Sequence, residues 1–261
     1  MKTALISDVH ANLAALQAVL AHIDAQGVDR ILSLGDVVGY GPDPAECVDL
    51  VAQRCEWSLL GNHDYAVLYE PTNFNAAAER AAFWTRDQLE PNERWDAETV
   101  KRRWEFLGRM RVRVVEGDFL AVHGSPRKPV NEYLFPDDVV QSPSKLASVF
   151  SRIDRACTVG HTHVPGVFTD DPEFFYLDDL DDNTFSISGT EKVIINPGSV
   201  GQPRDQDPRA SYAIVEHEPS KAVGAKVVFH RVEYPIEETV EKIRAIEELP
   251  DWLGERLLQG R

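Results

Sequence analysis

Residues 3–36 read TALISDVHANLAALQAVLAHIDAQGVDRILSLGD, in which two apolar runs flank a helical pattern. Residues 3–7 are typical of a buried strand, and residues 12–26 place leucines at helical spacing. Residues 30–34 form a second apolar run, which Gly35-Asp36 closes. A strand, a helix and a strand over so short a stretch predict a βαβ unit. The fold should therefore be α/β, with a sheet that begins parallel.

The same pattern continues as far as residue 60 and then changes. Asp43-Pro44-Ala45-Glu46 is a good helix start, with Asp43 as the N-cap and Pro44 in the first turn, and residues 57–60 read as a third strand. Residues 65–110 carry two helical patterns with no strand between them, so we expect a helical insertion that lies over the site. Within it, Trp84 and Trp104 should pack between helices, and they are also the first place to look for a nucleobase contact.

The second half of the chain is rich in strand signals. A hairpin is expected over residues 111–122, and residues 211–233 read as a second, later hairpin. We expect residues 167–192 to be a β-hairpin insertion with a run of aspartates at its solvated tip, and residues 235–261 to form C-terminal helices. Because no linker or repeat interrupts the chain, a single domain over residues 1–261 is predicted.

Charge and cysteine content limit the function classes. The formal net charge is −16, which disfavours a long nucleic-acid partner but is compatible with a small phosphorylated substrate held by metal ions. Three widely spaced cysteines argue against a disulfide framework and for a reducing, cytoplasmic location. No apolar stretch approaches the roughly 20 residues that span a bilayer, so no membrane partner is expected. The composition allows a homo-oligomer.

Polar motifs follow the expected strands and contain five of the eight histidines. In open α/β sheets, ligands bind outside the carboxyl ends of the strands. The candidate site residues at these ends are Asp8, His10, Asp36, Asn62, His63, His123, His161 and His163. A lone Asp or His is more often structural, so the hypothesis of a metal site depends on the coincidence of several such motifs.

The most telling motif is Gly160-His161-Thr162-His163, which follows an apolar run. Two histidines one residue apart point to the same side of an extended backbone, from which both can reach one metal cluster. Imidazole and carboxylate ligands without a thiolate suit Mn, Fe, Zn, Co or Ni. The set is larger than one tetrahedral site needs, and it fits two metal ions that share one carboxylate.

In order and spacing over residues 3–201, these motifs resemble the calcineurin-like metallophosphoesterase superfamily. The motifs are Asp8-x-His10, Gly35-Asp36, Gly61-Asn62-His63-Asp64, His123-Gly124 and Gly160-His161-Thr162-His163. Three further stretches resemble the bacterial and archaeal phosphodiesterase-like branch of this superfamily: Gly39–Pro44, His123–Pro126 and Asn196–Ser199. Some members of that branch act on small phosphodiesters or dinucleoside polyphosphates. The resemblance implies a four-layer α/β/β/α sandwich, in which two mixed sheets are flanked by helices.

The resemblance also implies two divalent transition-metal ions joined by Asp36, with Mn as the first choice and Fe, Zn, Ni or Co as alternatives. One ion would be held by Asp8, His10 and His163, and the other by Asn62, His123 and His161. His63 would not be a ligand. It would lie over the substrate as a catalytic residue, and would protonate the departing alkoxide or stabilise its charge.

One departure from related enzymes is informative. Gly39 and Tyr40 stand where phosphoprotein phosphatases have an Asp-Arg pair, which disfavours a phosphoprotein substrate. We assign the substitute phosphate contact first to Arg204 and then to Arg127. For each of these arginines, a role in a surface salt bridge is an equally good interpretation. Asn12 and Tyr40 are candidates for other polar contacts with the substrate.

The sequence therefore predicts a dinuclear-metal-dependent phosphoesterase that hydrolyses phosphodiester or phosphoanhydride bonds of a small, nucleotide-like substrate. A catalytically silent metal-binding scaffold of the same fold is the alternative from another class. Among enzymes, a phosphomonoesterase and a nuclease are the alternative activities, and the acidic net charge counts modestly against the nuclease. Dinucleoside polyphosphates and cyclic nucleotides compete as substrates.

Overall fold

The computed structural model describes all 261 residues and contains two six-stranded sheets. The first sheet has the strand order β3-β2-β1-β11-β12-β9. Its strands are β1 (Lys2–Ile6), β2 (Arg30–Ser33), β3 (Trp57–Ser58), β9 (Thr184–Ser186), β11 (Ala210–Glu216) and β12 (Lys226–Val232). Strands β1, β2 and β3 are parallel, whereas β11 is antiparallel to β1, so the sheet is mixed.

The second sheet is also mixed, with the strand order β4-β5-β6-β10-β7-β8. Its strands are β4 (Val114–Glu116), β5 (Phe119–Ala121), β6 (Ala156–Thr158), β7 (Gly166–Thr169), β8 (Glu173–Phe175) and β10 (Val193–Asn196). Strands β5, β6 and β10 are parallel, and β4 and β7 are antiparallel to their neighbours.

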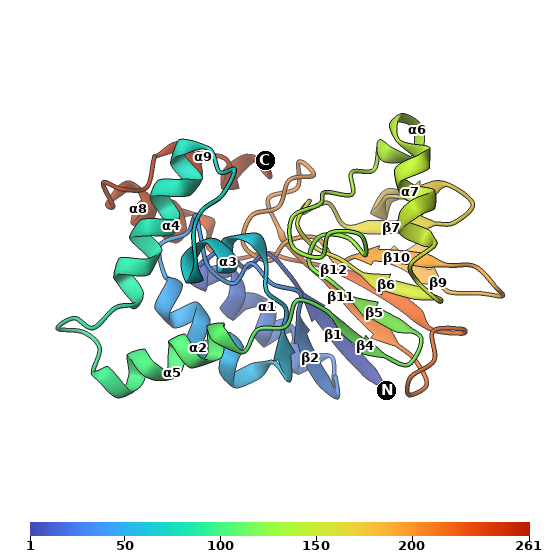
Figure 1. Cartoon of the computed structure of the whole chain (residues 1–261), viewed down its shortest axis with the longest axis horizontal. Helices are drawn as coiled ribbons and strands as arrows, with labels where there is room; N and C mark the ends of the chain where they lie inside the picture. The colour runs from blue at the N-terminus through green and yellow to red at the C-terminus, as the bar shows by residue number, and fades with distance from the viewer.

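Helices cover the outer faces of both sheets (Figure 1). On the side of the first sheet lie α1 (Leu13–Ala25), α2 (Pro44–Arg54), α3 (Asn62–Leu68), α4 (Ala76–Leu89), α5 (Ala97–Gly108), α8 (Ile236–Arg244) and α9 (Trp252–Glu255). On the side of the second sheet lie α6 (Asp138–Gln141) and α7 (Pro143–Phe150). None of these helices combines the length and the apolar character that crossing a membrane requires.

Both faces of each sheet are buried, which explains why the strands read as continuous apolar runs. In β1, Ala4 and Ile6 pack against the helices, whereas Leu5 faces the core between the sheets. In β10, Ile194 packs toward α7 and Ile195 faces the same core between the sheets. The result is the four-layer α/β/β/α sandwich that the sequence predicts.

The expected βαβ unit is present, with Thr3 of β1 opposite Arg30 of β2 in parallel register. Helix α2 begins at Pro44 as expected, but the Asp43 side chain does not cap it. Instead, Asp43 accepts bonds of 2.8 Å from Lys242 of α8. The hairpins β4–β5 and β11–β12 are confirmed.

Residues 167–192 do not form the expected hairpin insertion. Strand β8 pairs with β7 in the second sheet, whereas β9 pairs with β12 in the first sheet. The aspartate run between them lies in two short 3-10 turns, Leu177–Asp179 and Asp181–Asn183. The physical reason is that each strand completes the edge of a different sheet, and Phe185 of β9 joins the core between the sheets. We call this part of the chain the crossing segment, residues 173–186.

Helices α4 and α5 occupy the segment in which a helical insertion is expected. Helix α3 starts earlier than that segment, at Asn62, so one of the polar motifs forms its first turn. Trp84 is buried against Leu249 and Leu253 of the C-terminal segment, and Trp104 packs against the main helical core. The C-terminal helices are α8, α9 and a final 3-10 turn, Leu257–Gln259.

Candidate metal centre

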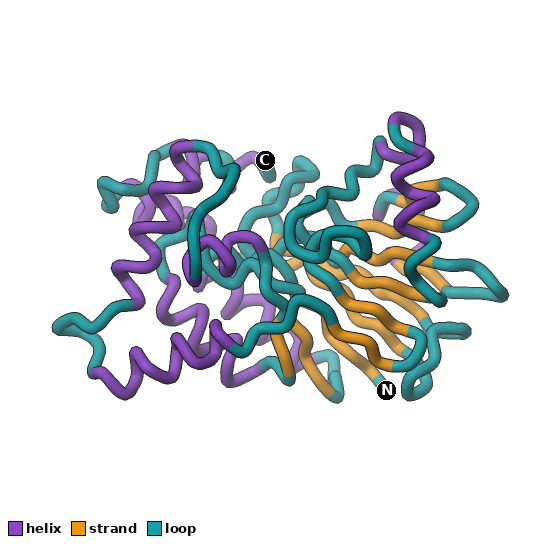
Figure 2. The backbone as a smooth tube through the Cα atoms, viewed as in Figure 1, coloured by secondary structure: helices purple, strands orange, loops and turns teal.

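The polar motifs gather where strands of both sheets end. Figure 2 shows the strands running into loops at this end of the sandwich, with the N-terminus of the chain at the opposite end. None of the candidate side chains exposes more than 8 % of its surface. The residues brought together are Asp8, His10, Asp36, Asn62, His63, His123, His161 and His163.

Asp8, His10 and His163 form the first group, whose ligand atoms lie within 4.8 Å of one another. His163 Nε2 is 3.2 Å from His10 Nε2 and 3.3 Å from Asp8 Oδ1. The other ring nitrogen of His163, Nδ1, lies 2.5 Å from the main-chain oxygen of Gln202. If Nδ1–H donates to that oxygen, the Nε2 lone pair faces the group, as metal ligation needs.

Asp36, His123 and His161 form the second group, again within 4.8 Å. His123 Nε2 is 3.3 Å from Asp36 Oδ2 and 3.3 Å from Asn62 Oδ1. His123 Nδ1 lies 2.8 Å from the Leu34 main-chain oxygen, which orients this ring in the same way. His161 Nε2 is buried and has no hydrogen-bond partner.

Asp36 faces both groups, because its Oδ2 is 3.7 Å from His10 Nε2 as well as 3.3 Å from His123 Nε2. Burial alone would raise the pKa of the Asp36 carboxyl, but the surrounding imidazoles, His123 foremost, hold that pKa well below its usual range. Burial lowers the pKa of His123, but the neighbouring Asp36 carboxylate outweighs this effect and raises that pKa to about 9. A cation that binds His123 must therefore displace a proton.

These residues fit divalent transition-metal ions. The donors are imidazole nitrogens, carboxylate oxygens and one amide oxygen, a set that suits Mn, Fe, Zn, Co or Ni. Both groups are buried, and the ring nitrogens His161 Nε2 and His10 Nδ1 have no partner within the protein. Cys47 and Cys157 belong to separate apolar cores, so the set contains no thiolate.

His161 and His163 do not lie on an extended backbone, contrary to expectation. Their φ angles are 68° and 63°, in the left-handed region. This conformation separates the two rings, and His163 joins the first group while His161 joins the second.

His63 forms a third group with His10 and Asp36, whose ligand atoms also lie within 4.8 Å of one another, and its ring is packed among aromatic rings. Its ring centroid is 4.3 Å from that of Tyr40, 4.7 Å from that of Phe74 and 4.8 Å from that of His10. Phe74 belongs to the connection between α3 and α4, so the helical segment does reach the site. Burial lowers the pKa of His63 to about 4, which leaves the ring neutral.

Gly39 explains why His63 can occupy this position. A Cβ atom at residue 39 would lie 2.5 Å from His63 Nδ1, and the Gly39 φ is +91°. The absence of a side chain at this position therefore makes room for the imidazole.

The four candidate substrate contacts divide into two pairs. Arg204 has a buried Nε without a partner, and it influences the pKa of Tyr40, His63 and His163, so it lies near the site. Tyr40 packs against His63 and His10.

Arg127 and Asn12 are engaged elsewhere. Arg127 Nη2 is paired with Glu132 at 2.9 Å, which agrees with the salt-bridge alternative. Asn12 is 1 % exposed and caps α1, where its Oδ1 accepts from Ala15 N at 3.2 Å. Its Nδ2 donates to the Gly201 main-chain oxygen at 2.9 Å. We therefore assign Asn12 to the scaffold of the site and not to substrate binding.

Sequence reasoning missed two residues that organise the loops. Asp64 accepts hydrogen bonds of 2.8–3.2 Å from four main-chain nitrogens, those of Asp36, Val37, Val38 and Gly61. Asn196 donates to the Gly160 main-chain oxygen at 2.9 Å. Both residues lie inside motifs that are visible in the sequence. Their place in these motifs is the only feature of the sequence that points to a structural role.

Comparisons with known proteins agree with the fold. The calcineurin-like phosphoesterase superfamily domain matches residues 1–220. An uncharacterized protein of Methanocaldococcus jannaschii is 38% identical over 265 residues, covering 99% of this chain and 98% of that protein. The chain therefore belongs to the calcineurin-like phosphoesterase superfamily, and this membership supports a phosphoesterase activity in general.

Solved structures show the same relationship. A metallophosphoesterase from Sphaerobacter thermophilus is 41% identical, with a TM-score of 0.80 over 100% of this chain and 99% of that chain. A hypothetical protein from Pyrococcus horikoshii is 20% identical, with a TM-score of 0.74 over 100% of this chain and 98% of that chain, and shares the fold.

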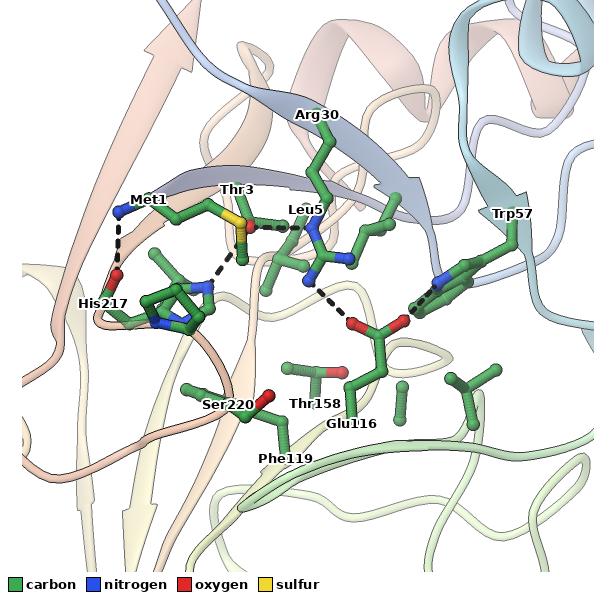
Figure 3. A pocket seen from close by; sticks show the side chains of 15 residues that line it. Met1, Thr3, Leu5, Arg30, Trp57, Glu116, Phe119, Thr158, His217 and Ser220 are labelled. Atoms are coloured by element: carbon green, nitrogen blue, oxygen red, sulfur yellow. Dashed lines mark hydrogen bonds and ion pairs between the residues drawn. The ribbon is translucent and has the colours of Figure 1, made fainter.

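A separate cavity of about 310 Å³ lies between the sheets, toward the starts of β1 and β5 (Figure 3). Arg30 and Glu116 form an ion pair of 2.7 Å across it, and Trp57 donates to Glu116 at 2.9 Å. The candidate metal ligands instead follow the carboxyl ends of these strands, so this cavity is not part of the metal centre.

Proposed function

We propose that the protein is a dinuclear-metal-dependent phosphoesterase that cleaves phosphodiester or phosphoanhydride bonds of a small, nucleotide-like substrate. The observation that carries this proposal is the pair of buried Asp/His groups that Asp36 joins. Asp8, His10 and His163 would hold one ion, and Asn62, His123 and His161 the other. Mn is the first choice of metal, with Fe, Zn, Ni and Co as alternatives.

Two bound cations supply charge neutralisation at the phosphate and a more acidic water molecule. The chain's own contribution is position and electrostatics. Asp36 orients the two groups toward each other, and its Oδ1 accepts a bond of 2.8 Å from the His63 main-chain nitrogen, which ties the two residues together. Arg204 brings a guanidinium without a carboxylate partner to the phosphate.

His63 is proposed to protonate the departing oxygen. Its neutral, buried ring would take up a proton when a phosphate brings negative charge beside it, because an adjacent anion raises the pKa of an imidazole. Tyr40 and Phe74 hold the ring in place by packing against it. The net charge of −16 supports a small substrate over a long nucleic acid.

The decisive experiment is a substrate and metal panel. Chelator-treated protein is reloaded with Mn²⁺, Ni²⁺, Co²⁺ or Zn²⁺ in turn and assayed on phosphomonoesters, phosphodiesters and dinucleoside polyphosphates. We expect two metal ions per chain by elemental analysis and metal-dependent turnover of a diester or an anhydride. Two bound ions without turnover on any ester would instead favour a silent scaffold.

The His63→Ala variant tests the proton donor. It should keep both metal ions and lose about 10²–10⁴-fold in kcat on an ester with a poor leaving group. The loss should shrink for p-nitrophenyl esters, whose leaving group needs no proton. His217→Ala, which removes a histidine far from the site, is the matched control. Equal kcat of His63→Ala and the unaltered protein on alkyl esters would remove His63 from the mechanism.

A further inference from the structure

A groove of about 720 Å³ opens beside the metal centre. It is lined by Val164 and Pro165, which directly follow His163, and by Arg204 and Phe135. The crossing segment contributes Tyr176 and Asp178 to its lining. Its volume is within the range of pockets that hold small molecules.

The inner end of the groove is suited to one anion. Arg204 Nη2 donates to Gln202 Oε1 at 2.8 Å, and the main-chain oxygen of the same Gln202 lies 2.5 Å from His163 Nδ1. Gln202 therefore links Arg204 to His163, a candidate metal ligand. Arg204 is only partly buried and its Nε has no partner within the protein, so this guanidinium keeps its charge without a carboxylate beside it and can attract a phosphate.

The other arginines of the groove are neutralised. Arg231 is paired with Asp205, and Arg209 Nη2 contacts Asp207 Oδ2 at 2.6 Å. Arg204 is the only arginine of the lining without a carboxylate partner. The groove therefore offers a single place for a phosphate, at the end nearest the metal centre.

A column of stacked rings leads from the metal centre into the groove. The Tyr133 ring stacks on His161 with centroids 3.7 Å apart, at an interplanar angle of 18°. Phe135 stacks on Tyr133 with centroids 5.1 Å apart, at an angle of 8°. Phe135 is 48% exposed and lines the groove. A flat aromatic group can thus extend the column.

The outer part of the groove repels further phosphate groups. Asp178 and Asp137 line the groove, and neither forms an ion pair with a lysine or an arginine. Their carboxylates can accept hydrogen bonds from hydroxyl and amino groups. An uncharged group with an aromatic ring and several donors fits this part of the groove better than a second phosphate does.

We propose that this groove binds the nucleoside end of a nucleotide substrate, with the phosphate at Arg204 and the base against Phe135. The inference rests on the proposed phosphoesterase function and identifies the substrate class: a phosphate ester of a nucleoside. Asp178 and Asp137 would take the sugar hydroxyls and amino groups.

Calorimetric titration of the Mn²⁺-loaded protein with adenosine 5′-monophosphate and with ribose 5-phosphate tests the proposal. The two probes share the sugar phosphate and differ in the base. We expect the nucleotide to bind about 5- to 100-fold more tightly, the usual effect of stacking one base. In Phe135→Ala the difference should disappear while the affinity for ribose 5-phosphate is unchanged. Arg204→Gln should weaken both probes to the same extent.

Phe83→Ala is the matched control, because Phe83 is 46% exposed on α4, away from the groove, and this variant should retain the preference. Equal affinities of the two probes, or a Phe135→Ala variant that keeps the preference, would overturn the proposal. Hydrolysis of bis(p-nitrophenyl) phosphate is measured on the same samples. Turnover without a base preference contradicts only the groove, and a base preference without turnover on any ester contradicts only the proposed function.

Discussion

Five of the candidate metal ligands have a left-handed backbone, although none of them is glycine. These residues are Asp8, His10, Asp36, His161 and His163, with φ between 47° and 68°. Such conformations cost about 1–3 kcal/mol each and persist only where surrounding contacts enforce them. Bonds between loops do so here, for example from His10 N to Asp36 O at 2.9 Å and from Asp8 N to Gly35 O at 3.0 Å.

The Gly39→Ala substitution tests how closely His63 is held. The new Cβ would lie 2.5 Å from His63 Nδ1, so the imidazole must move. We expect kcat on alkyl phosphate esters to fall about tenfold or more, because a displaced acid loses part of its effect, while elemental analysis still finds both metal ions. Gly27→Ala is the control, since Gly27 has a φ of +63° but no atom within 4 Å of the added Cβ. Full activity of Gly39→Ala would show that the position of His63 is not critical.

The Asp64→Ala substitution should be strongly destabilising. Asp64 satisfies four buried main-chain donors in the loops that carry Asp36 and Asn62. Leaving them unpaired should lower the free energy of unfolding by about 3–5 kcal/mol in urea denaturation. Asp96→Ala, which removes an exposed cap of α5, should cost only about 1 kcal/mol. A loss for Asp64→Ala as small as that of the cap variant would contradict this role.

At the scale of elements, each strand of the parallel part of a sheet delivers a short loop to the same end of the sandwich. The helices that follow hold these loops from outside. Helix α1 is attached to β11 and β12 by a ring cluster, in which His22 bonds to the Tyr212 hydroxyl at 2.8 Å and His230 stacks on Tyr212 at 4.8 Å.

The cluster predicts a pH effect on stability. Burial, together with His22, lowers the pKa of His230 to about 4, from 6.5 for an ordinary histidine. Because the folded state resists protonation, the stabilising effect is complete above pH 6.5 and is lost as the pH falls toward 4. His230 is half-buried, so solvent screening reduces the effect to about 1 kcal/mol between pH 7 and pH 5.

The His230→Phe variant measures this effect. Its free energy of unfolding, from urea denaturation, should decrease between pH 7 and pH 5 by about 1 kcal/mol less than that of the unaltered protein. Titrating groups remote from His230 act in both proteins and cancel in the difference. Identical pH dependence of the two proteins would refute the assignment.

At the scale of the whole molecule, the candidate metal centre joins the two sheets. Asp8, Asp36 and Asn62 follow strands of the first sheet, whereas His123 and His161 follow strands of the second. An ion held by both sets would add a cross-link between the sheets, at the opposite end from the ion pair of Arg30 and Glu116.

Metal loading should therefore stabilise the whole fold. At a free Mn²⁺ concentration of about 1,000 times Kd, binding adds about 4 kcal/mol to the free energy of unfolding. We expect the Tm in calorimetry to rise with Mn²⁺ and to fall with a chelator. Asp36→Asn should lower both the metal content and the gain in Tm, whereas Asp24→Asn, at an exposed position, should change neither. Full metal occupancy in Asp36→Asn would exclude Asp36 as the residue that joins the two ions.

The sequence alone determined the α/β class of the fold and the candidate side chains at the ends of its strands. Both follow from local patterns: apolar runs mark the strands, and parallel strands bring the residues after their carboxyl ends to one edge. Asp8, His10 and Asp36 were therefore predictable as neighbours.

Only the tertiary structure decided how these side chains are used. It gave His161 and His163 a left-handed backbone, assigned Asn12 to the scaffold, paired Arg127 with Glu132 and sent the crossing segment from one sheet to the other. It also brought Phe135 and Arg204 into the lining of one groove. These outcomes depend on contacts between segments far apart in the chain and on left-handed backbone conformations, and neither is encoded in the spacing of residue types.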